Sequence, residues 1–411
     1  MRTRNAALAL SAGGRSVFVA ALVGGILFVA ACALPNVGLF DENKVGDTPR
    51  YERYGNELLD GRLPYRDFYM EYPPGALPVF VAPALGSGEG YATRFKLLQC
   101  LLGVLTVALV ALALRARRAG PRRLATAVAF IGLAPAALGT VFLVNFDLWP
   151  TLLTTAALAA LLHGRERLGL AALAAGTAAK VYPLVLLPLA LLFIRERSGT
   201  RAAWIAGAVF AGTLTAVALP FALLSPGGFG FSLSVAIRRP LQIESLGSSF
   251  LLAAHQLGTY DPGVNSHYDS QNLDGALPHG VAAATLLLEA LALLAVWAWF
   301  ARRPAADRFL VAAAAAVTAF VAFGKILSPQ YLVWLVPLVA LLPQRRALAA
   351  SLLAAALVLT QLWFPSRYGD LVALGSVSWL VLARDLVLVG LFVLLAQTLR
   401  SEVTVPEARD G

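Results

Sequence analysis

The first long polar segment of the chain holds the residues whose types suit acid–base chemistry. Thr-Pro at 48–49 is typical of a helix start, and Asp-Gly at 60–61 of a helix stop. Asp47 therefore stands directly before the expected helix, where the helix dipole favours an ionised carboxylate. Such a group can take a proton from a hydroxyl or merely cap the helix, and both interpretations stay open. Asp41, just after the first apolar run, is either a second candidate base or a solvated interface charge.

The end of the same segment reads Glu71-Tyr72-Pro73-Pro74-Gly75. Two prolines fix the backbone φ angle, and the first of them pushes Tyr72 towards extended geometry. We expect a rigid turn that presents Glu71 and Tyr72 to a cavity. The alternative is a plain turn without a function.

Lys180 stands in the middle of an otherwise apolar run, residues 168–194. A lysine in such a run costs about 2.5 to 3.5 kcal/mol on insertion scales, and it usually lines a cavity or finds an anionic partner. The alternative is a lysine that extends to the lipid headgroups. We group Tyr182 with Lys180 as a candidate binding residue. Asp147, which precedes Leu-Trp-Pro, is interpreted as a helix cap.

Further polar candidates follow later in the chain. Arg238 and Arg239 suit the binding of a phosphate group. His267 lies in the same polar segment. The histidines of this segment are not spaced as metal ligands, so we expect neither a metal nor a cofactor. Gln330 and Tyr331 open a late apolar run.

The composition sets the class of protein. Of the 411 residues, 59% are hydrophobic and only 14% charged, whereas an ordinary soluble domain carries about 25% charged residues. One water-soluble core cannot bury this excess, and short charged clusters separate apolar runs of membrane-spanning length. The sequence therefore predicts an all-α, polytopic membrane protein. It excludes a soluble enzyme, a coiled coil, a disulfide scaffold and a disordered chain.

Ten apolar runs predict membrane spans. They lie near 16–35, 95–114, 124–144, 148–163, 202–224, 279–301, 309–324, 329–343, 347–364 and 376–399. The run 168–194 is too long for one ordinary span. Two short helices that meet at 180–183 would place its flanking arginine clusters on one side, as the positive-inside rule requires. We therefore predict about 12 membrane helices, with a short hairpin at Lys180. In the first outer loop we predict a short amphipathic helix that lies on the membrane surface.

Sorting the charges by side explains the net charge of +10. If both termini lie in the cytoplasm, the inner loops are short and basic, as the positive-inside rule requires. The positive charge therefore reflects membrane topology, and the sequence shows no basic segment that would bind nucleic acid. Two outer loops are large, 36–94 and 225–278, within a single transmembrane domain over 1–411. The unusual polar residues lie in these loops and in the outward turns. We therefore expect the functional site on the outer face.

Several motifs resemble the GT-C superfamily of polytopic glycosyltransferases, and in particular the family 87 type of high-GC bacteria. The similar organisation runs from about residue 16 to 399. The motifs are Asp47-x-x-x-Tyr51, LDGRLPY at 59–65, EYPP at 71–74, GTAAKVYP at 176–183 and SPQY at 328–331.

This resemblance implies transfer of a hexose, mannose in that family type, from a polyprenyl-phosphate donor to a glycolipid or wall glycan at the outer face of a bacterial plasma membrane. It implies an acidic catalytic base in the first outer loop, which corresponds to Asp47, with Asp41 as the alternative because the chain offers both acids. The sequence departs from the family in the unusually charged stretch 41–44, and the choice between the two acids stays open. With a β-linked donor, direct displacement would yield an α-mannoside. The residues that we assign to substrate binding are Tyr51, Glu71, Tyr72, Lys180, Tyr182, Arg238, Arg239, His267, Gln330 and Tyr331.

The residues fit this chemistry without the resemblance. A lipid phosphate is already a good leaving group, so one carboxylate that takes the proton of the acceptor hydroxyl suffices. The pair of flanking carboxylates that glycosidases use is not required. The alternative is a transporter or flippase for a lipid-linked or anionic substrate. Against it, inverted repeats are not evident, and the polar residues gather at one face instead of the bilayer midplane.

Overall fold

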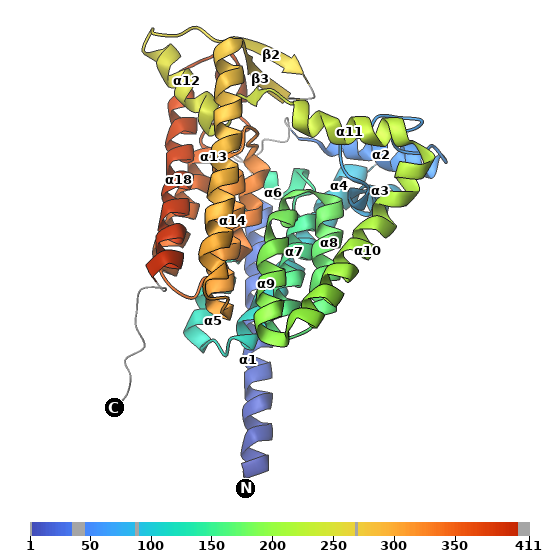
Figure 1. Ribbon diagram of the computed structural model, residues 1–411, viewed down its shortest axis with the longest axis vertical. Helices are drawn as coiled ribbons and strands as arrows, with labels where there is room; N and C mark the ends of the chain where they lie inside the picture. The colour runs from blue at the N-terminus through green and yellow to red at the C-terminus, as the bar shows by residue number, and fades with distance from the viewer. Residues whose placement is uncertain (1, 35–45, 87–89, 268–269, 402–411) are drawn as a thin grey trace. The chain divides into compact units, whose positions relative to one another are not determined.

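The structure is a computed structural model that describes residues 2–34, 46–86, 90–267 and 270–401, and the side chains from Gly14 onwards except that of Ala236. It consists mainly of helices (Figure 1). The chain divides into two compact units. The first unit comprises 1–184 and 205–238, and the second comprises 185–204 and 239–411.

Six helices of the described residues are long and apolar enough to cross a membrane. They are the Gly14–Ala33 part of α1 (Arg2–Ala33), α4 (Tyr91–Ala116), α10 (Thr200–Leu224), α13 (Ala276–Ala301), α14 (Ala306–Phe323) and α18 (Ser378–Ser401). Shorter apolar helices lie at Pro74–Ala84, Leu148–Leu162, Pro329–Leu341 and Arg346–Gln361. The structure therefore confirms a multi-span helical protein. It does not confirm the expected count of about 12 spans.

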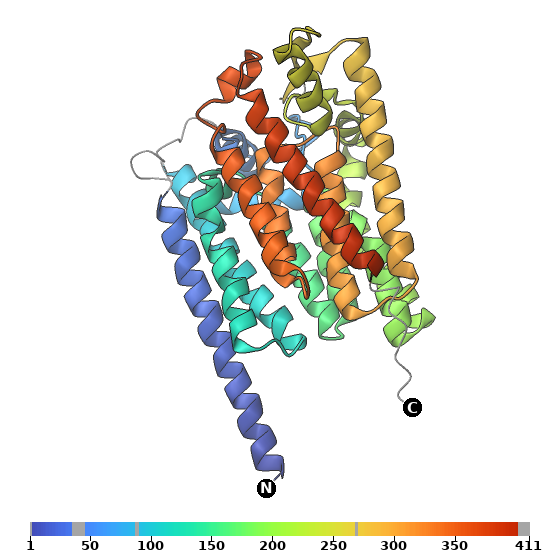
Figure 2. The ribbon, with the colours of Figure 1, turned by 90° about the vertical axis from the view of Figure 1, so that its left-hand side faces the viewer.

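In the first unit, α1 packs against α4 and α5 (Pro121–Leu138), as Figure 2 shows. Short turns join α4 to α5 and α7 (Leu148–Leu162) to α8 (Glu166–Ala179), and the two helices of each pair pack together. Each pair is thus antiparallel. The beginning of α7 and the end of α8 therefore lie at the same end of their pair, away from the turn that joins them.

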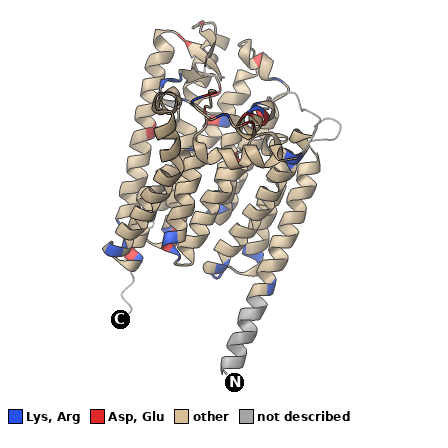
Figure 3. Cartoon of the chain, turned by 90° about the vertical axis from the view of Figure 1, so that its right-hand side faces the viewer, with Lys and Arg blue, Asp and Glu red and all other residues tan. Residues whose placement is uncertain are grey.

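Basic side chains mark the turns of these pairs. Five arginines lie between 115 and 123, and two more lie at 165 and 167. In the cartoon of Figure 3, positions of Lys and Arg predominate at the end of the chain with these turns, whereas acidic and basic positions are mixed at the other end. The first unit thus has one basic end and one end of mixed charge.

Helix α2 (Thr48–Leu59) begins and ends where the sequence predicts. Its buried face carries Tyr51 and Tyr54, at 1% and 0% exposure. Gly55 lets it approach α3 (Leu77–Ala84), because a Cβ there would lie 2.5 Å from the carbonyl oxygen of Phe80. The helix is therefore amphipathic and packs directly on the segment that follows the proline turn.

The chain breaks at Lys180, whose backbone is extended (φ −159°, ψ 136°). Helix α8 ends at Ala179, a 3₁₀ helix η4 spans Tyr182–Leu186, and α9 spans Leu187–Ser198. Pro183 contributes to the break because it has no backbone N–H for a continuing helix. The run 168–194 is thus not one helix. Because α8 and α9 belong to different units, the hairpin stays a prediction.

The second unit is built around α14, which packs against α13, α15 (Leu332–Leu341) and α18. Its other elements are α12 (Leu246–Gln256), η5 (Pro329–Tyr331), α16 (Arg346–Gln361) and α17 (Tyr368–Val372). A small antiparallel sheet has the order β1 (Leu241–Gln242), β3 (Ser270–Asp274), β2 (Gly263–His267). Its register pairs Leu241 with Leu273 and Asn265 with Asn272. The segment expected as the second outer loop thus contains α11 (Pro226–Arg238), this sheet and α12.

Candidate active site

Asp47 occupies the position before the first residue of α2, but its carboxylate does not cap the helix. Its backbone carbonyl accepts hydrogen bonds from the amides of Arg50 and Tyr51, at 2.9 and 3.1 Å. Its side chain instead accepts a hydrogen bond from the Tyr51 hydroxyl, with 3.3 Å between Oη and Oδ2. The sequence left open whether this carboxylate caps the helix, and in the structure it does not.

Arg50 joins α2 to the proline turn. Its Nη1 donates a hydrogen bond to Glu71 Oε1 at 2.6 Å and lies 3.8 Å from Asp47 Oδ1. One guanidinium group thus stands beside two carboxylates. Arg50 was not among the predicted site residues. The sequence signal for it was weak, because it lay among other charged residues of the same segment.

The proline turn rests on the end of α8. A Cβ at Gly75 would lie 2.5 Å from the carbonyl carbon of Ala178, so a larger residue does not fit there. Trp149 of α7 donates its indole N–H to the Gly75 carbonyl at 2.9 Å. These contacts hold the proline turn against the helix end that precedes Lys180. The presentation of Glu71 and Tyr72 to a cavity stays a prediction.

Asp147 and Lys180 form an ion pair, with 2.7 Å between Oδ1 and Nζ. Asp147 precedes α7 as predicted, but its side chain does not cap that helix, so the cap interpretation is wrong. The ammonium group also lies 4.8 Å from the centre of the Phe146 ring. The sequence indicated that a lysine in an apolar run needs an anionic partner, but it did not identify Asp147 as that partner.

Aromatic rings pack around Asp47 and around the Asp147–Lys180 pair. Tyr51 stacks on Phe80 at 4.6 Å between ring centres, and Tyr72 packs edge-on against Phe146 at 4.9 Å. Tyr51 and Tyr72 also contact each other, at 5.8 Å. Burial raises the pKa of both tyrosine hydroxyls well above the usual value, so both stay neutral hydrogen-bond donors at physiological pH.

Asp47 is the most accessible carboxylate of this cluster. Its side chain is 28% exposed, compared with 7% for Glu71 and 2% for Asp147. Burial raises its pKa above the usual value of aspartate, and the negative charges of Glu71 and Asp147 act in the same direction. The positive charges of Arg50 and Lys180 oppose this rise. Asp47 is thus a reachable carboxylate with an increased proton affinity.

The structure brings together five of the predicted site residues in the first unit: Asp47, Tyr51, Glu71, Tyr72 and Lys180. Tyr182 lies nearby but is buried, and its hydroxyl is hydrogen-bonded to Thr154 at 3.0 Å, so it supports the packing of α7 on the break. Arg238 is the last residue of α11 in the same unit.

The remaining predicted residues lie elsewhere. Arg239, the exposed His267 of β2, and Gln330 and Tyr331 of η5 belong to the second unit, so their participation in this site stays a prediction. Asp41 lies outside the described residues. Among the residues that the structure describes, no three His, Cys, Asp or Glu side chains are grouped as a metal site.

Replacing Arg50 with Met should shift the acidic limb of the pH–activity profile to higher pH, by about one unit. A base at Asp47, as the family resemblance implies, must be deprotonated to act. Removing the cation that opposes the raised pKa of Asp47 raises that pKa further. Activity is then lost at a higher pH as the solution is acidified. Arg53→Met is the matched control, because Arg53 lies on the same helix and contacts the Tyr54 ring instead. A limb that stays in place or moves to lower pH in Arg50→Met would contradict this electrostatic role.

In overall structure the chain is similar to the crystal structure of the Archaeoglobus fulgidus oligosaccharyltransferase tethered to an acceptor peptide containing the NVT sequon, with a TM-score of 0.42 and 13% identity. That match covers 95% of this chain and 56% of the oligosaccharyltransferase, so the chain spans little more than half the length of that protein. No curated protein matches the chain.

The model of glycosyltransferase family 87 matches residues 69–329, well over half of the chain. The match contains Glu71, Tyr72, Asp147 and Lys180, whereas Asp47 precedes it. It confirms the resemblance that the sequence motifs indicated. The chain belongs to glycosyltransferase family 87.

Proposed function

We propose that this protein transfers a hexose, mannose by its resemblance to the family type, from a polyprenyl-phosphate donor to a glycolipid or wall glycan acceptor. The transfer takes place at the outer face of a bacterial plasma membrane and inverts the anomeric centre. The observation that carries this proposal is the single accessible carboxylate, Asp47, within a cluster whose other two carboxylates are almost fully buried. Direct displacement needs one such base.

In this mechanism the Asp47 carboxylate takes the proton of the acceptor hydroxyl. The hydroxyl oxygen forms a bond to C1 of the donor hexose as the bond from C1 to the phosphate oxygen breaks. The electron pair of that bond leaves with the polyprenyl phosphate, which needs no proton to depart. Arg50 keeps Asp47 close to its working protonation state by opposing the rise of its pKa.

The departing phosphate is assigned to Lys180. In the structure the ammonium group binds Asp147. The lysine side chain is 14% exposed, so a ligand can approach its positive charge. Charge-assisted hydrogen bonds to a phosphate strengthen as negative charge develops on it. Arg238 and Arg239 are proposed as further phosphate ligands.

The charge distribution supports an extracytoplasmic site. The arginine-rich turns that join α4 to α5 and α7 to α8 lie at the end of these helices opposite to Asp147 and Lys180. Cytoplasmic loops carry an excess of Lys and Arg. With those turns in the cytoplasm, the charged cluster faces the outside, where a lipid-linked donor reaches it from the bilayer and nucleotide sugars are absent.

An assay of the purified protein with a lipid-linked donor and with a nucleotide-sugar donor tests this function. In lipid nanodiscs with mixed cell-envelope glycolipids as acceptors, labelled polyprenyl-phosphomannose should give a labelled product, and GDP-mannose should give none. Transfer from GDP-mannose, or no transfer from the lipid-linked donor, would overturn the proposal. Movement of intact lipid-linked sugar across a vesicle bilayer without transfer would favour the transporter alternative.

A further inference from the structure

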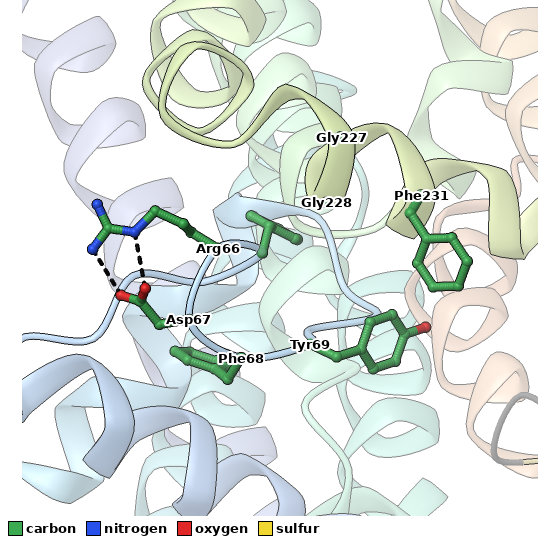
Figure 4. Close-up of a pocket in the computed structure, with 8 residues that line it drawn as sticks. Arg66, Asp67, Phe68, Tyr69, Gly227, Gly228 and Phe231 are labelled. Carbon is green, nitrogen blue, oxygen red and sulfur yellow. Dashed lines mark hydrogen bonds and ion pairs between the residues drawn. The ribbon is translucent and has the colours of Figure 1, made fainter.

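A pocket of about 480 Å³ lies in the first unit, between the turn 65–69 and the start of α11 (Figure 4). Gly227, Gly228 and Phe231 of α11 form one side, and the five residues of the turn form the other. The sequence did not predict this pocket, because its two sides are about 160 residues apart in the chain.

Specific contacts hold the two sides of the pocket together. Ser225 and Ser232 donate hydrogen bonds to the carbonyl oxygens of Tyr65 and Met70, at 3.0 and 2.7 Å. A Cβ at Gly228 would lie 1.9 Å from the Tyr65 carbonyl oxygen, so only glycine allows this approach. Tyr65 itself has a positive φ of 68°, a conformation that few non-glycine residues adopt. The pocket is therefore a built feature and not a gap between loosely placed segments.

The two ends of the pocket differ in chemistry, as Figure 4 shows. At one end, the rings of Tyr69 and Phe231 meet edge-on at 5.9 Å and are 40% and 50% exposed. At the other end, Arg66 and Asp67 form a doubly hydrogen-bonded pair, with both N–O distances at 2.9 Å. Aromatic surface thus adjoins a charge pair whose net charge is zero.

This combination suits a neutral, hydroxyl-rich ligand. A sugar packs its C–H groups against aromatic rings and forms hydrogen bonds from its hydroxyl groups to charged side chains. An aromatic pocket with a few polar groups provides both kinds of contact. A phosphate headgroup instead requires an excess of positive charge. Here the carboxylate of Asp67 neutralises the guanidinium of Arg66, so the pocket favours a sugar over a phosphate.

The pocket shares a wall with the charged cluster around Asp47. The Tyr65 hydroxyl donates a hydrogen bond to the Tyr72 carbonyl at 2.6 Å. Phe68 stacks on Tyr54 at 5.9 Å, and the Tyr54 ring meets that of Tyr72 edge-on at 6.4 Å. Direct packing contacts therefore join the pocket to the charged cluster that contains Asp47.

We propose that the pocket between turn 65–69 and α11 binds a neutral hexose unit of the acceptor glycan. This inference rests on the proposed function, because it assigns a subsite to the acceptor of that reaction. The pocket sets which acceptors are used and takes no part in the bond-forming step.

Filling the pocket provides the sharpest test. Gly227 lines it, and a Cβ there meets no atom within 4 Å. Gly227→Leu should therefore place its side chain in the pocket without displacing the backbone. Gly230→Leu is the matched control, because Gly230 lies on the same helix, also faces open space and does not line the pocket. A second variant, Phe231→Leu, removes a ring but keeps an apolar side chain, and Phe250→Leu changes an equally exposed ring of α12.

The readout is the dissociation constant for α-mannotriose, measured by saturation-transfer NMR on the full chain in nanodiscs. Gly227→Leu should raise it about tenfold, which corresponds to ~1.4 kcal/mol, and Phe231→Leu several-fold. Both control variants should stay within about twofold of wild type. In transfer assays the same two variants should raise KM for the acceptor and leave KM for the donor unchanged.

The outcomes separate this inference from the proposed function. Wild-type protein that transfers sugar, with equal trisaccharide affinity and acceptor KM in all four variants, overturns the subsite and leaves the function standing. Wild-type protein that binds the trisaccharide through Gly227 and Phe231 but transfers nothing supports the subsite and overturns the function. Failure of wild-type protein to bind α-mannotriose, or its displacement from the pocket by inorganic phosphate, also overturns the subsite.

Discussion

Asp47→Asn is expected to lower kcat by a factor of about 10² to 10⁴, the contribution that a positioned general base usually makes. The amide keeps the shape of the carboxylate and still accepts a hydrogen bond from Tyr51, which lies at 3.3 Å. It cannot take the proton of the acceptor hydroxyl. Turnover of the lipid-linked donor by the purified variant, at saturating donor and acceptor, measures the effect.

Asp41→Asn is the control for this loss, because Asp41 is the alternative base that the sequence offers. The account predicts that this variant keeps most of the activity. Equal thermal stability of both variants would show that a loss in Asp47→Asn is not caused by unfolding. Full activity in Asp47→Asn, or loss in Asp41→Asn alone, would contradict the assignment of the base.

Lys180→Met is expected to cause the largest loss of stability among single substitutions at the site. Asp147 is 2% exposed and its Oδ1 lies 2.7 Å from the lysine ammonium group. Removing one partner of a buried ion pair typically costs about 3 to 5 kcal/mol, because the remaining charge loses its compensation. The melting temperature of the protein in nanodiscs should therefore fall by several degrees.

The double variant Lys180→Met with Asp147→Asn separates the structural role of Lys180 from its role in binding. It removes both charges, so most of the lost stability should return. If Lys180 also binds the donor phosphate, the stable double variant should still show a raised KM for the donor. A melting temperature as low as that of the single variant would contradict the ion-pair account. A wild-type KM for the donor would contradict the phosphate role.

Local signals in the sequence predicted local structure well. The bounds of α2 follow from the Thr-Pro and Asp-Gly pairs at its ends, which act within one helical turn. The rigid turn at 71–75 and the break at Lys180 follow from proline, whose effect is confined to its neighbours. Five of the twelve predicted site residues also gather in one cluster of the first unit.

Contacts between distant residues were not predictable from these signals. The pair of Asp147 and Lys180 spans 33 residues, and the serine contacts of α11 span about 160. Such pairings depend on how helices pack, which hydrophobic periodicity does not encode. The expected count of about 12 spans is not confirmed. Several of the predicted runs form apolar helices of only 10–17 residues, such as α7 and α15.

The anomeric configuration of the product tests the central claim most directly, because that claim is direct displacement assisted by one carboxylate. Wild-type protein would be supplied with β-linked polyprenyl-phosphomannose, and the new glycosidic bond assigned from its one-bond C1–H1 coupling by NMR. We expect an α-mannoside from wild-type protein, and the same product at a greatly reduced rate from Asp47→Asn. A β-mannoside would require a second displacement at C1, and it would contradict the single-base mechanism.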